Sequence, residues 1–319
     1  MQLNSMIHGV DVAKDELVVQ HLGDRAVRRL ANSASAIRTW LRGLPEGSVV
    51  AMESTGRFHR LVAQLAFEAG MQVYVLNARN VHFYAKGLGM RSKTDRVDTG
   101  VIARYVAEHQ DKLHPWRPQQ SLPSRPEELI RRRALVVTKR EALRQCLREC
   151  PELKEAWSQL DRAFVEFLRR LDKQVKQLIE ADDKLRAAQK RIQTVVGFGP
   201  LGSALLASVL QRIPFASSDS LVAYSGWDPR PDDSGRKHGK RRLTKAGPAY
   251  MRRQWYMVGL TAARTKALKP AYQALRARGL ATTEAAIILA RKLLRAAYAV
   301  WKTGHPFDLD RFIGKTKSA

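Results

Sequence analysis

Two aspartates, Asp95 and Asp98, stand three residues apart at the front of an apolar helical pattern, in the stretch KTDRVDTGVIARY (residues 93–105). Positions i and i+3 of a helix share a face, so both carboxylates point the same way. The positive end of a helix dipole favours ionised carboxylates in the first turn. For this pair taken alone, helix capping by solvated acids is therefore the simpler interpretation.

Two further acids lie where strands are expected, and they favour a metal site over capping. Asp11 stands between two valines in GVDVA, a costly place for a charge unless something compensates it. Glu53 ends the expected strand SVVAMES, on the same face as its residues Val49 and Ala51. Open α/β sheets bind ligands at the carboxyl ends of their strands, and hard cations take carboxylate oxygens. We expect a shared site for one or two Mg²⁺ ions, which can clamp a phosphodiester during displacement, at Asp11, Glu53, Asp95 and Asp98.

The positive charge of the chain predicts a polyanionic partner. The formal net charge is +26, and residues 191–319 hold 23 Lys and Arg against 7 Asp and Glu. An uneven basic surface of this kind is typical of nucleic-acid binding. The last third of the chain is the strongest candidate for that surface.

A serine inside a cationic stretch is the second group that could carry chemistry. Ser234-Gly235 lies in SGWDPRPDDSGRKHGKRRLTKAGPAYMRR (residues 225–253), where Ser225-Gly226 has the same two letters. A serine hydroxyl is a weak nucleophile that needs activation, which a polarised phosphate and nearby cations could supply. Residue chemistry alone leaves the choice between the two serines open. We expect phosphate contacts in this stretch at Arg236, Lys237, Lys240, Arg241, Arg242 and Lys245, and a further nucleic-acid contact at Lys93.

The first third of the chain alternates between strand and helix patterns and predicts an α/β domain over residues 1–115. Strands are expected at 6–13, 16–22, 25–32, 48–54 and 71–77. Helices are expected at 33–44, at 57–70 and from the aspartate pair onward. A basic, glycine-containing loop is expected to lead from the last strand to the aspartates.

Helical patterns dominate the rest. Residues 111–126 hold four of the 13 prolines and are expected to be a linker within a second segment, residues 116–190. A near-heptad spacing there predicts a helical hairpin or an intermolecular coiled coil, with a long helix packed on its own domain as the alternative. The apolar residues with this spacing are Leu153, Trp157, Leu160, Phe164, Phe167, Leu171, Val175 and Leu178.

The third expected segment, residues 191–319, is mainly helical with a polar loop at 228–247. Its stretch VVGFGPLGSALLAS (residues 195–208) resembles the hairpin of a helix-hairpin-helix. In that motif, glycine amides at a helix N-terminus can hold a backbone phosphate, and a plain tight turn is the alternative.

The motifs together resemble a known family. GVDVAK, MESTG and KTDRVDTGVIARY resemble the DEDD pattern of a RuvC-like, RNase H-type domain, in particular that of the Piv-type invertases and related insertion-sequence transposases. This resemblance covers most of residues 5–108. YSGWDPRPDDSG, KAG, MRR and ARKLLRAAYAVW resemble the C-terminal domain of the same transposases over residues 195–307. The chain departs from the pattern at Pro248, where an asparagine usually follows the K-x-G.

The resemblance implies a fold class, an activity and partners. The fold would be α/β plus all-α: a RuvC-like domain, a coiled-coil segment and a helical serine domain. Ser234 falls on the serine that the family attaches covalently to DNA, with Mg²⁺ at the four acids and a composite site built by both domains. Similarity to the bridge-RNA-guided recombinases implies a structured guide RNA that pairs with donor and target DNA.

Composition and termini bear on location and partners. No apolar run approaches the roughly 20 residues that span a bilayer, and MQLNSMIHGVDV lacks the features of a signal peptide. We expect a cytoplasmic homo-oligomer, a dimer or a tetramer, without a membrane partner. Two rival functions stay open: a RuvC-like junction nuclease that uses water as its nucleophile, and a non-catalytic RNA-binding scaffold.

Overall fold

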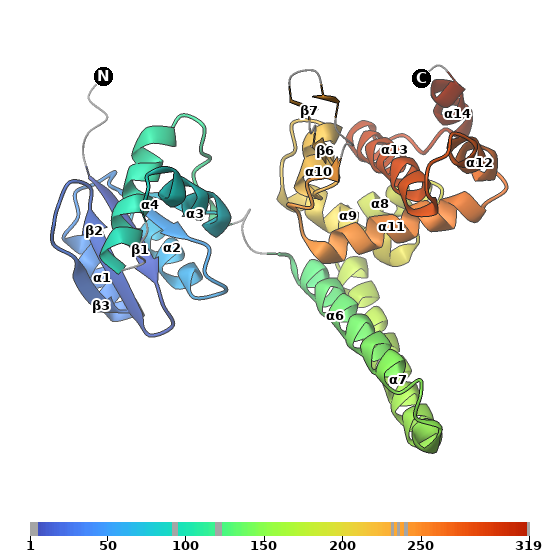
Figure 1. Ribbon diagram of the computed structural model, residues 1–319, viewed down its shortest axis with the longest axis horizontal. Helices are drawn as coiled ribbons and strands as arrows, with labels where there is room; N and C mark the ends of the chain where they lie inside the picture. The colour runs from blue at the N-terminus through green and yellow to red at the C-terminus, as the bar shows by residue number, and fades with distance from the viewer. Residues whose placement is uncertain are drawn as a thin grey trace. The chain divides into compact units, whose positions relative to one another are not determined.

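The computed structural model describes residues 6–90, 95–118, 123–230, 233–234, 237–238 and 242–317, without the side chains of 95–98, 230, 233–234, 237–238 and 315–317. The chain forms two compact units, Met1–Leu122 and Pro123–Ala319. The first is an α/β unit and the second is almost entirely helical (Figure 1). Among the described helices, none is both long and apolar enough to cross a bilayer.

A five-stranded sheet forms the centre of the α/β unit. Its strands are β1 (Ile7–Val12), β2 (Glu16–His21), β3 (Arg28–Ala31), β4 (Val49–Glu53) and β5 (Gln72–Leu76), in the order β3-β2-β1-β4-β5. β2 runs antiparallel to β1 and β3, whereas β1, β4 and β5 run parallel. The carboxyl ends of β1, β4 and β5 therefore meet at one edge, as expected for a RuvC-like α/β fold.

Helices cover both faces of this sheet. α1 (Ala34–Arg42) and α2 (His59–Glu68) bury one side of it together with Val10, Val50 and Met52. α3 (Ala78–Gly87) and α4 (Asp95–His109) cover the other side, where α4 packs along β1, β2 and β4. Alternation along β1 explains this division, because Val10 and Val12 lie in the first core and Ile7 lies in the second.

The prediction of a loop between the last strand and the aspartates is wrong for residues 78–87. Residues 78–87 form helix α3, and the side chain of Asn77 caps it by accepting a hydrogen bond from the Arg79 amide at 2.9 Å. Asparagine is a strong N-cap residue, and Val81 packs into the core as a helical residue should. The two nearby glycines fall at the end of the helix and after it, so they end it and do not prevent it.

The helical unit is built around a sequence of α-helices with a few short strands. The α-helices are α6 (Arg125–Cys146), α7 (Lys154–Glu180), α8 (Asp183–Gln193), α9 (Pro200–Arg212), α10 (Ser218–Tyr224), α11 (Ala249–Arg264), α12 (Lys269–Ala277), α13 (Thr282–Thr303) and α14 (Leu309–Lys317), and a 3-10 turn, Pro151–Leu153, precedes α7. The stretch expected to be a polar loop at 228–247 contains β6 (Pro229–Arg230) paired with β9 (Arg242–Leu243), and β7 (Asp233–Ser234) paired with β8 (Lys237–His238).

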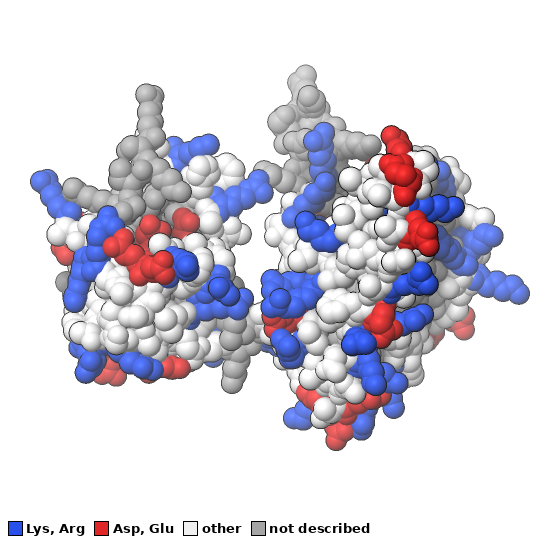
Figure 2. Space-filling view, turned by 90° about the horizontal axis from the view of Figure 1, so that it is seen from below, with Lys and Arg blue, Asp and Glu red and all other residues white. Residues whose placement is uncertain are grey.

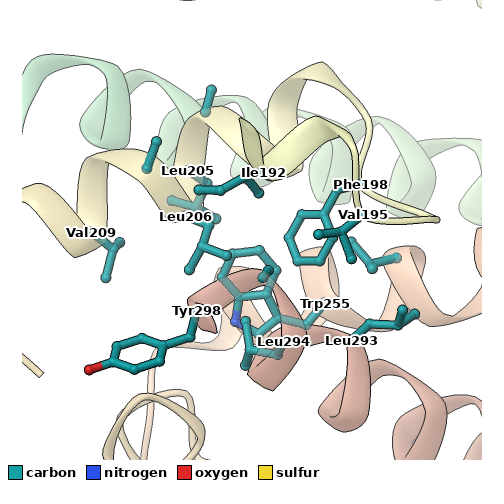
Figure 3. Close-up of a cluster of buried hydrophobic side chains, with 14 of the residues drawn as sticks. Ile192, Val195, Phe198, Leu205, Leu206, Val209, Trp255, Leu293, Leu294 and Tyr298 are labelled. Atoms are coloured by element: carbon teal, nitrogen blue, oxygen red, sulfur yellow. The ribbon is translucent and has the colours of Figure 1, made fainter. Parts of the chain in front are cut away.

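Trp255 of α11 lies at the centre of the helical core. Figure 3 shows its ring between side chains of α8, α9 and α13, with Leu206 and Leu294 close to it. The side chain of Trp255 is 1% exposed, and its ring centroid lies 5.9 Å from that of Phe198. Truncating a buried tryptophan typically costs about 3–5 kcal/mol, so this residue is a principal source of stability in the unit.

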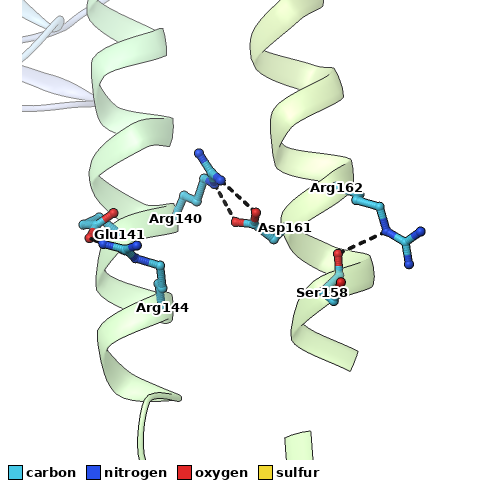
Figure 4. A network of polar contacts seen from close by, with 6 residues as sticks. All are labelled: Arg140, Glu141, Arg144, Ser158, Asp161 and Arg162. Atoms are coloured by element: carbon cyan, nitrogen blue, oxygen red, sulfur yellow. Dashed lines mark hydrogen bonds and ion pairs between the residues drawn. The ribbon is translucent and has the colours of Figure 1, made fainter. Parts of the chain in front are cut away.

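α6 and α7 form an antiparallel hairpin that projects from the rest of the helical unit (Figure 1). Bidentate ion pairs join the two helices. One runs from Arg133 to Asp172. The other, from Arg140 to Asp161 at 2.6 and 2.7 Å, is drawn in Figure 4. The Arg140 guanidinium holds the pKa of the Asp161 carboxyl below its usual value. The hairpin, one of the two arrangements favoured by the near-heptad spacing, is therefore present within one chain.

The face of α7 that packs within the chain differs from the one that the spacing indicated. The residues of α7 that form the ion pairs, and its buried residues Leu168, Val175 and Ile179, mark the face that meets α6 and the core. Most of these residues lie one position after those of the predicted apolar stripe, which turns the packed face by about 100°. The predicted stripe joins the core only near its end, through Leu171, Val175 and Leu178. Its earlier residues Leu153, Leu160 and Phe167 remain 42%, 45% and 51% exposed.

A buried carboxylate fastens the base of the hairpin to the rest of the helical unit. Glu127 of α6 is 1% exposed and accepts hydrogen bonds from the Arg212 guanidinium at 2.9 and 3.0 Å. The Tyr250 hydroxyl donates to the same carboxylate at 2.9 Å, and burial together with the Glu127 charge raises the pKa of Tyr250. One side chain thus ties α6 to α9 and α11.

Replacing Glu127 with alanine should destabilise the helical unit by about 3–5 kcal/mol, because the buried Arg212 cation would lose its partner. The neighbouring variant Glu128→Ala is the control, since Glu128 pairs with the exposed Arg125 and Arg132 and its loss should cost less than about 1 kcal/mol. Urea unfolding followed by circular dichroism measures both. Equal losses in the two variants would contradict the proposed role of Glu127.

Candidate active site and nucleic-acid interface

Asp11 and Glu53 stand next to each other at the carboxyl edge of the sheet. β1 and β4 run parallel with Gly9 opposite Ala51, so the next position on the same face pairs Asp11 with Glu53. Both residues are half-buried, and Glu53 is the last residue of β4. The face that they share carries Ile7, Val49 and Ala51 and is the one covered by α4.

A glycine brings α4 against this face. A Cβ at Gly9 would lie 2.0 Å from the Thr99 carbonyl oxygen and 3.0 Å from the Ala103 amide, so only glycine permits the contact. The buried Thr99 hydroxyl donates a hydrogen bond to the Gln20 side chain at 2.8 Å, and Gln20 pairs with Gly9 across the two strands. This close contact lies one residue after Asp98, so it fixes the first turns of α4 against β1.

Extending the strand register puts two of the four predicted acids, Asp11 and Glu53, at neighbouring positions on one face, and the structure gives the backbone position of the other two. Asp95 and Asp98 lie in the first turn of α4, but their side chains fall outside the described residues. Among the side chains that the structure describes, no three histidines, cysteines or acids gather as metal ligands. The donors already adjacent, Asp11 and Glu53, are carboxylates, which suit Mg²⁺. Convergence of all four acids stays a prediction.

The loop that carries Ser234, residues 228–247 (the serine loop), has a tightly packed base. A Cβ on Gly247 would lie 2.3 Å from the Tyr224 carbonyl oxygen and 2.6 Å from the Gly226 amide nitrogen, so the two glycines pack against each other without room for a side chain. The Thr244 hydroxyl donates to the Asp228 carboxylate at 2.5 Å, and the Thr244 amide donates to the Asp228 carbonyl at 3.1 Å. The base is therefore a fixed platform for the stretch that carries Ser234.

A two-stranded hairpin places Ser234 at the far end of this loop. In the β7–β8 pair, Ser234 is opposite Lys237, and Asp233 is opposite His238. The side chains of these four residues lie outside the described part of the chain. The register alone puts a cationic position directly across from the predicted nucleophile.

Only part of the predicted nucleic-acid contact set is described. Arg242 and Lys245 are exposed, and Lys245 has a positive φ of 52° that its neighbour Arg252 supports by donating hydrogen bonds to the Lys245 and Gly247 carbonyls. Pro248, the departure from the family pattern, is the N-cap residue of α11. Lys93, Arg236, Lys240 and Arg241 lie outside the described residues.

Ser225, the rival serine, is engaged in the core. It is 0% exposed, its hydroxyl donates to the Leu221 carbonyl at 3.0 Å, and it accepts a hydrogen bond from the Trp255 indole at 3.1 Å. A hydroxyl that is buried and bonded in this way cannot reach a DNA phosphate without local unfolding. Its contacts explain Ser225 as a support for the loop base.

Sequence reasoning missed a half-buried cation of α13, Arg291, on which the charge of Asp228 at the base of the loop acts. Its Nε is buried and has no hydrogen-bond partner among the described residues. Burial and the nearby charge of Arg295 lower the pKa of the Arg291 guanidinium. The negative charges of Asp219 and Asp228 raise it, but they offset only part of this decrease. The motif ARKLL contains this arginine, so its charge within an apolar helix was the signal available in the sequence.

The segment that resembles a helix-hairpin-helix joins α8 to α9. Gly197 there has a φ of +93°, and a Cβ would come 2.5 Å from the Val258 carbonyl, so the turn packs tightly on α11. A hollow of about 1230 Å³ lies beside it, and its lining includes Lys173, Lys176, Arg186 and Lys190. Figure 2 shows, on the visible face of each unit, Lys and Arg side chains widely spread with Asp and Glu among them.

Comparison with known families decides which class of protein this is. A family model described as a transposase, of the DEDD type named after IS110, matches residues 8–155. A second, described as the transposase IS116/IS110/IS902 family, matches residues 189–273. The chain belongs to the IS110-type DEDD transposases. Transposases of this kind cleave DNA and typically depend on a metal ion.

Two relatives of this transposase are described as pilin gene-inverting proteins. One is from Moraxella bovis and the other from Moraxella lacunata. Each is 28% identical over 269 residues, which span 81% of this chain and 81% of the relative. The similarity thus extends over both units.

Replacing Gly9 with alanine should displace α4 and weaken metal binding, because the added Cβ would overlap the Thr99 carbonyl. Overpacking of this kind typically costs about 1–3 kcal/mol. Isothermal titration with Mn²⁺ and thermal unfolding measure the two effects. Gly43→Ala is the control, since φ there is −84° and the nearest atom would lie at 3.4 Å. Unchanged Mn²⁺ affinity in folded Gly9→Ala would contradict the role given to α4.

Proposed function

We propose that this transposase cleaves and rejoins DNA through a phosphoserine at Ser234, with Asp11, Glu53, Asp95 and Asp98 holding Mg²⁺. The observation that carries the proposal is the contrast between the two serines. Ser225 is buried and bonded to Trp255, whereas Ser234 lies at the end of a hairpin opposite a lysine position. A metal ion at the acids would polarise the scissile phosphate and neutralise part of its charge.

The proposed chemistry conserves the number of phosphodiester-type bonds. The Ser234 oxygen bonds to phosphorus, the bond from phosphorus to one deoxyribose oxygen breaks, and the serine proton passes to solvent or to the departing oxygen. Attack on the serine phosphodiester by a hydroxyl of a second DNA strand then restores a DNA backbone and frees the serine. The cations near Ser234 suit the phosphate charge that develops in both steps.

The proposed partners are donor DNA, target DNA and a structured guide RNA. Support comes from the net charge of +26, from the hollow beside the 195–199 turn with its four cations, and from the family. In the turn itself, the N-terminus of α9 is suited to a backbone phosphate. Arg291 is a further candidate for contact with phosphate near the base of the serine loop.

We also propose that the exposed stripe of α7 joins copies of the transposase. Leu160 and Phe167 of α7, and Leu153 directly before it, are large, apolar and exposed at seven-residue spacing, and the contacts of α7 with α6 lie on another face. Burial of such side chains against a second copy would remove apolar surface from water. The seam expected between 116 and 190 would then link protomers.

Ser234→Ala should abolish the covalent intermediate and strand exchange while DNA binding stays nearly intact, because one hydroxyl adds little to a phosphate-dominated affinity. Denaturing electrophoresis of a reaction with labelled DNA should show protein-linked DNA for the wild type only. Asp95→Asn should also stop the reaction, since a neutral amide is a poor Mg²⁺ ligand. Folded Ser225→Ala is the control and should still form the adduct. Cleavage without any adduct would instead indicate water as the nucleophile.

Leu160→Glu together with Phe167→Glu should shift the protein toward monomer, because buried carboxylates at an apolar seam lack partners. Sedimentation velocity measures the shift. Leu61→Glu serves as the control, since Leu61 is 38% exposed on α2 and lies outside the stripe. An oligomer that survives the double substitution would place the interface elsewhere.

A further inference from the structure

Helix α3, which lies beside the acids, presents a surface that the proposed chemistry does not use. β5 pairs with β4 so that Leu76 is opposite Glu53, and the Ser54 amide donates to the Leu76 carbonyl at 2.9 Å. Asn77 follows directly and caps α3. The helix therefore begins at the same sheet edge as the acids Asp11 and Glu53.

The inner face of α3 is held firmly. Val81 is 3% exposed in the core, and the Tyr84 ring packs edge-on against Tyr105 of α4 with centroids 5.1 Å apart. The Tyr84 hydroxyl donates to Glu108 at 2.6 Å. These contacts on one side fix which residues of α3 face outward, and the neighbouring ribbons of α3 and α4 can be followed in Figure 1.

The outer face combines an exposed aromatic ring with cations. Phe83 is 55% exposed, and Arg79 and Lys86 lie one turn to either side of it, both exposed. The Arg79 guanidinium stands 5.4 Å from the Phe83 ring centroid, and the His82 ring lies 5.8 Å away. Residues 78–87 contain no acid. The face is therefore positively charged around a flat apolar ring.

A single exposed phenylalanine is ordinary on a protein surface and needs no function. Phe67 of α2 provides the comparison, since it is 40% exposed but packs edge-on against Trp116 and is followed by Glu68. Phe83 differs because cations flank it and because its helix begins beside the acids. A ring between cations matches the two halves of a nucleotide, a base to stack and a phosphate to pair.

We propose that the Arg79–Phe83–Lys86 face of α3 binds an unpaired nucleotide, with its base stacked on Phe83 and the adjoining phosphates on Arg79 and Lys86. The inference rests on the proposed function and deepens it, since strand exchange requires nucleotides to leave a duplex near the acids. Stacking on an aromatic ring tolerates any base, so this surface would hold a strand without reading its sequence.

The test uses the full-length protein in EDTA, so that binding is measured without cleavage. The probes are a fluorescein-labelled single-stranded oligonucleotide, as DNA and as RNA of the same sequence, and the corresponding blunt DNA duplex. Fluorescence anisotropy gives each affinity. Phe83→Ala should weaken single-strand binding roughly five- to hundredfold and leave duplex binding within about twofold. Preference for the DNA or the RNA strand identifies which nucleic acid supplies the nucleotide.

Matched variants separate base stacking from a purely apolar contact. Phe83→Tyr should retain affinity and Phe83→Leu should lose it, because leucine keeps the apolar bulk without the flat ring. Arg79→Gln and Lys86→Gln should each reduce the slope of log K against log salt by about 0.7 for single strands. Phe67→Ala, which removes the other exposed phenylalanine of this unit, should bind like the wild type.

Three outcomes would overturn the inference: wild-type affinity in Phe83→Ala, equal losses for duplex and single strand, or full affinity in Phe83→Leu, which would indicate an apolar protein contact. The Ser234 adduct assay is independent of these measurements. An adduct without any effect of Phe83 removes this inference alone. An effect of Phe83 without an adduct removes the serine mechanism and leaves the nucleotide surface standing.

Discussion

The contact between β1 and α4 at Gly9 is the constraint on which the α/β unit depends. A helix can approach a strand this closely only where the side chain is a hydrogen atom, and here the Thr99 carbonyl occupies the space that a Cβ would need. The buried Thr99–Gln20 hydrogen bond satisfies polar groups that the approach removes from water. α4 in turn supports α3 through Tyr84 and Tyr105. The absence of a side chain at Gly9 thus determines where α4 begins against the sheet and, through α4, the position of α3.

In the helical unit, a buried hydrophobic core supports the polar loop that carries Ser234. Trp255 fills the core with its ring and donates its indole hydrogen to Ser225, directly before the loop that carries Ser234. The tightly packed pair Gly226 and Gly247 then closes the base of that loop. A tightly packed base and a cationic sequence around Ser234 suit a group that must meet a phosphate in a defined position.

Sequence patterns predicted the strands well because alternation and β-branched content report burial directly. They also placed Glu53 on one face with Val49 and Ala51, and that face is the one covered by α4. Helix α3 was missed because its basic residues and glycines indicated a loop, while the cap at Asn77 and the burial of Val81 decide the matter. The stripe of α7 that packs on α6 was missed because ion pairs form part of it, and an apolar repeat cannot reveal them. The role of Ser225 depends on a residue 30 positions away, which no local motif contains.

The two stripes of α7 restrict how the length of the hairpin can change during evolution. Inserting one residue in the helix would turn everything beyond it by about 100° and exchange the stripe that meets α6 for the exposed one. Inserting seven residues in α7 and seven in α6 would rotate the far part by only about 20° and lengthen the arm by about 10 Å. Hairpins of different length in relatives should therefore differ by multiples of seven residues in each helix. Residues of α7 outside the two stripes are under no such restriction and can vary in sequence.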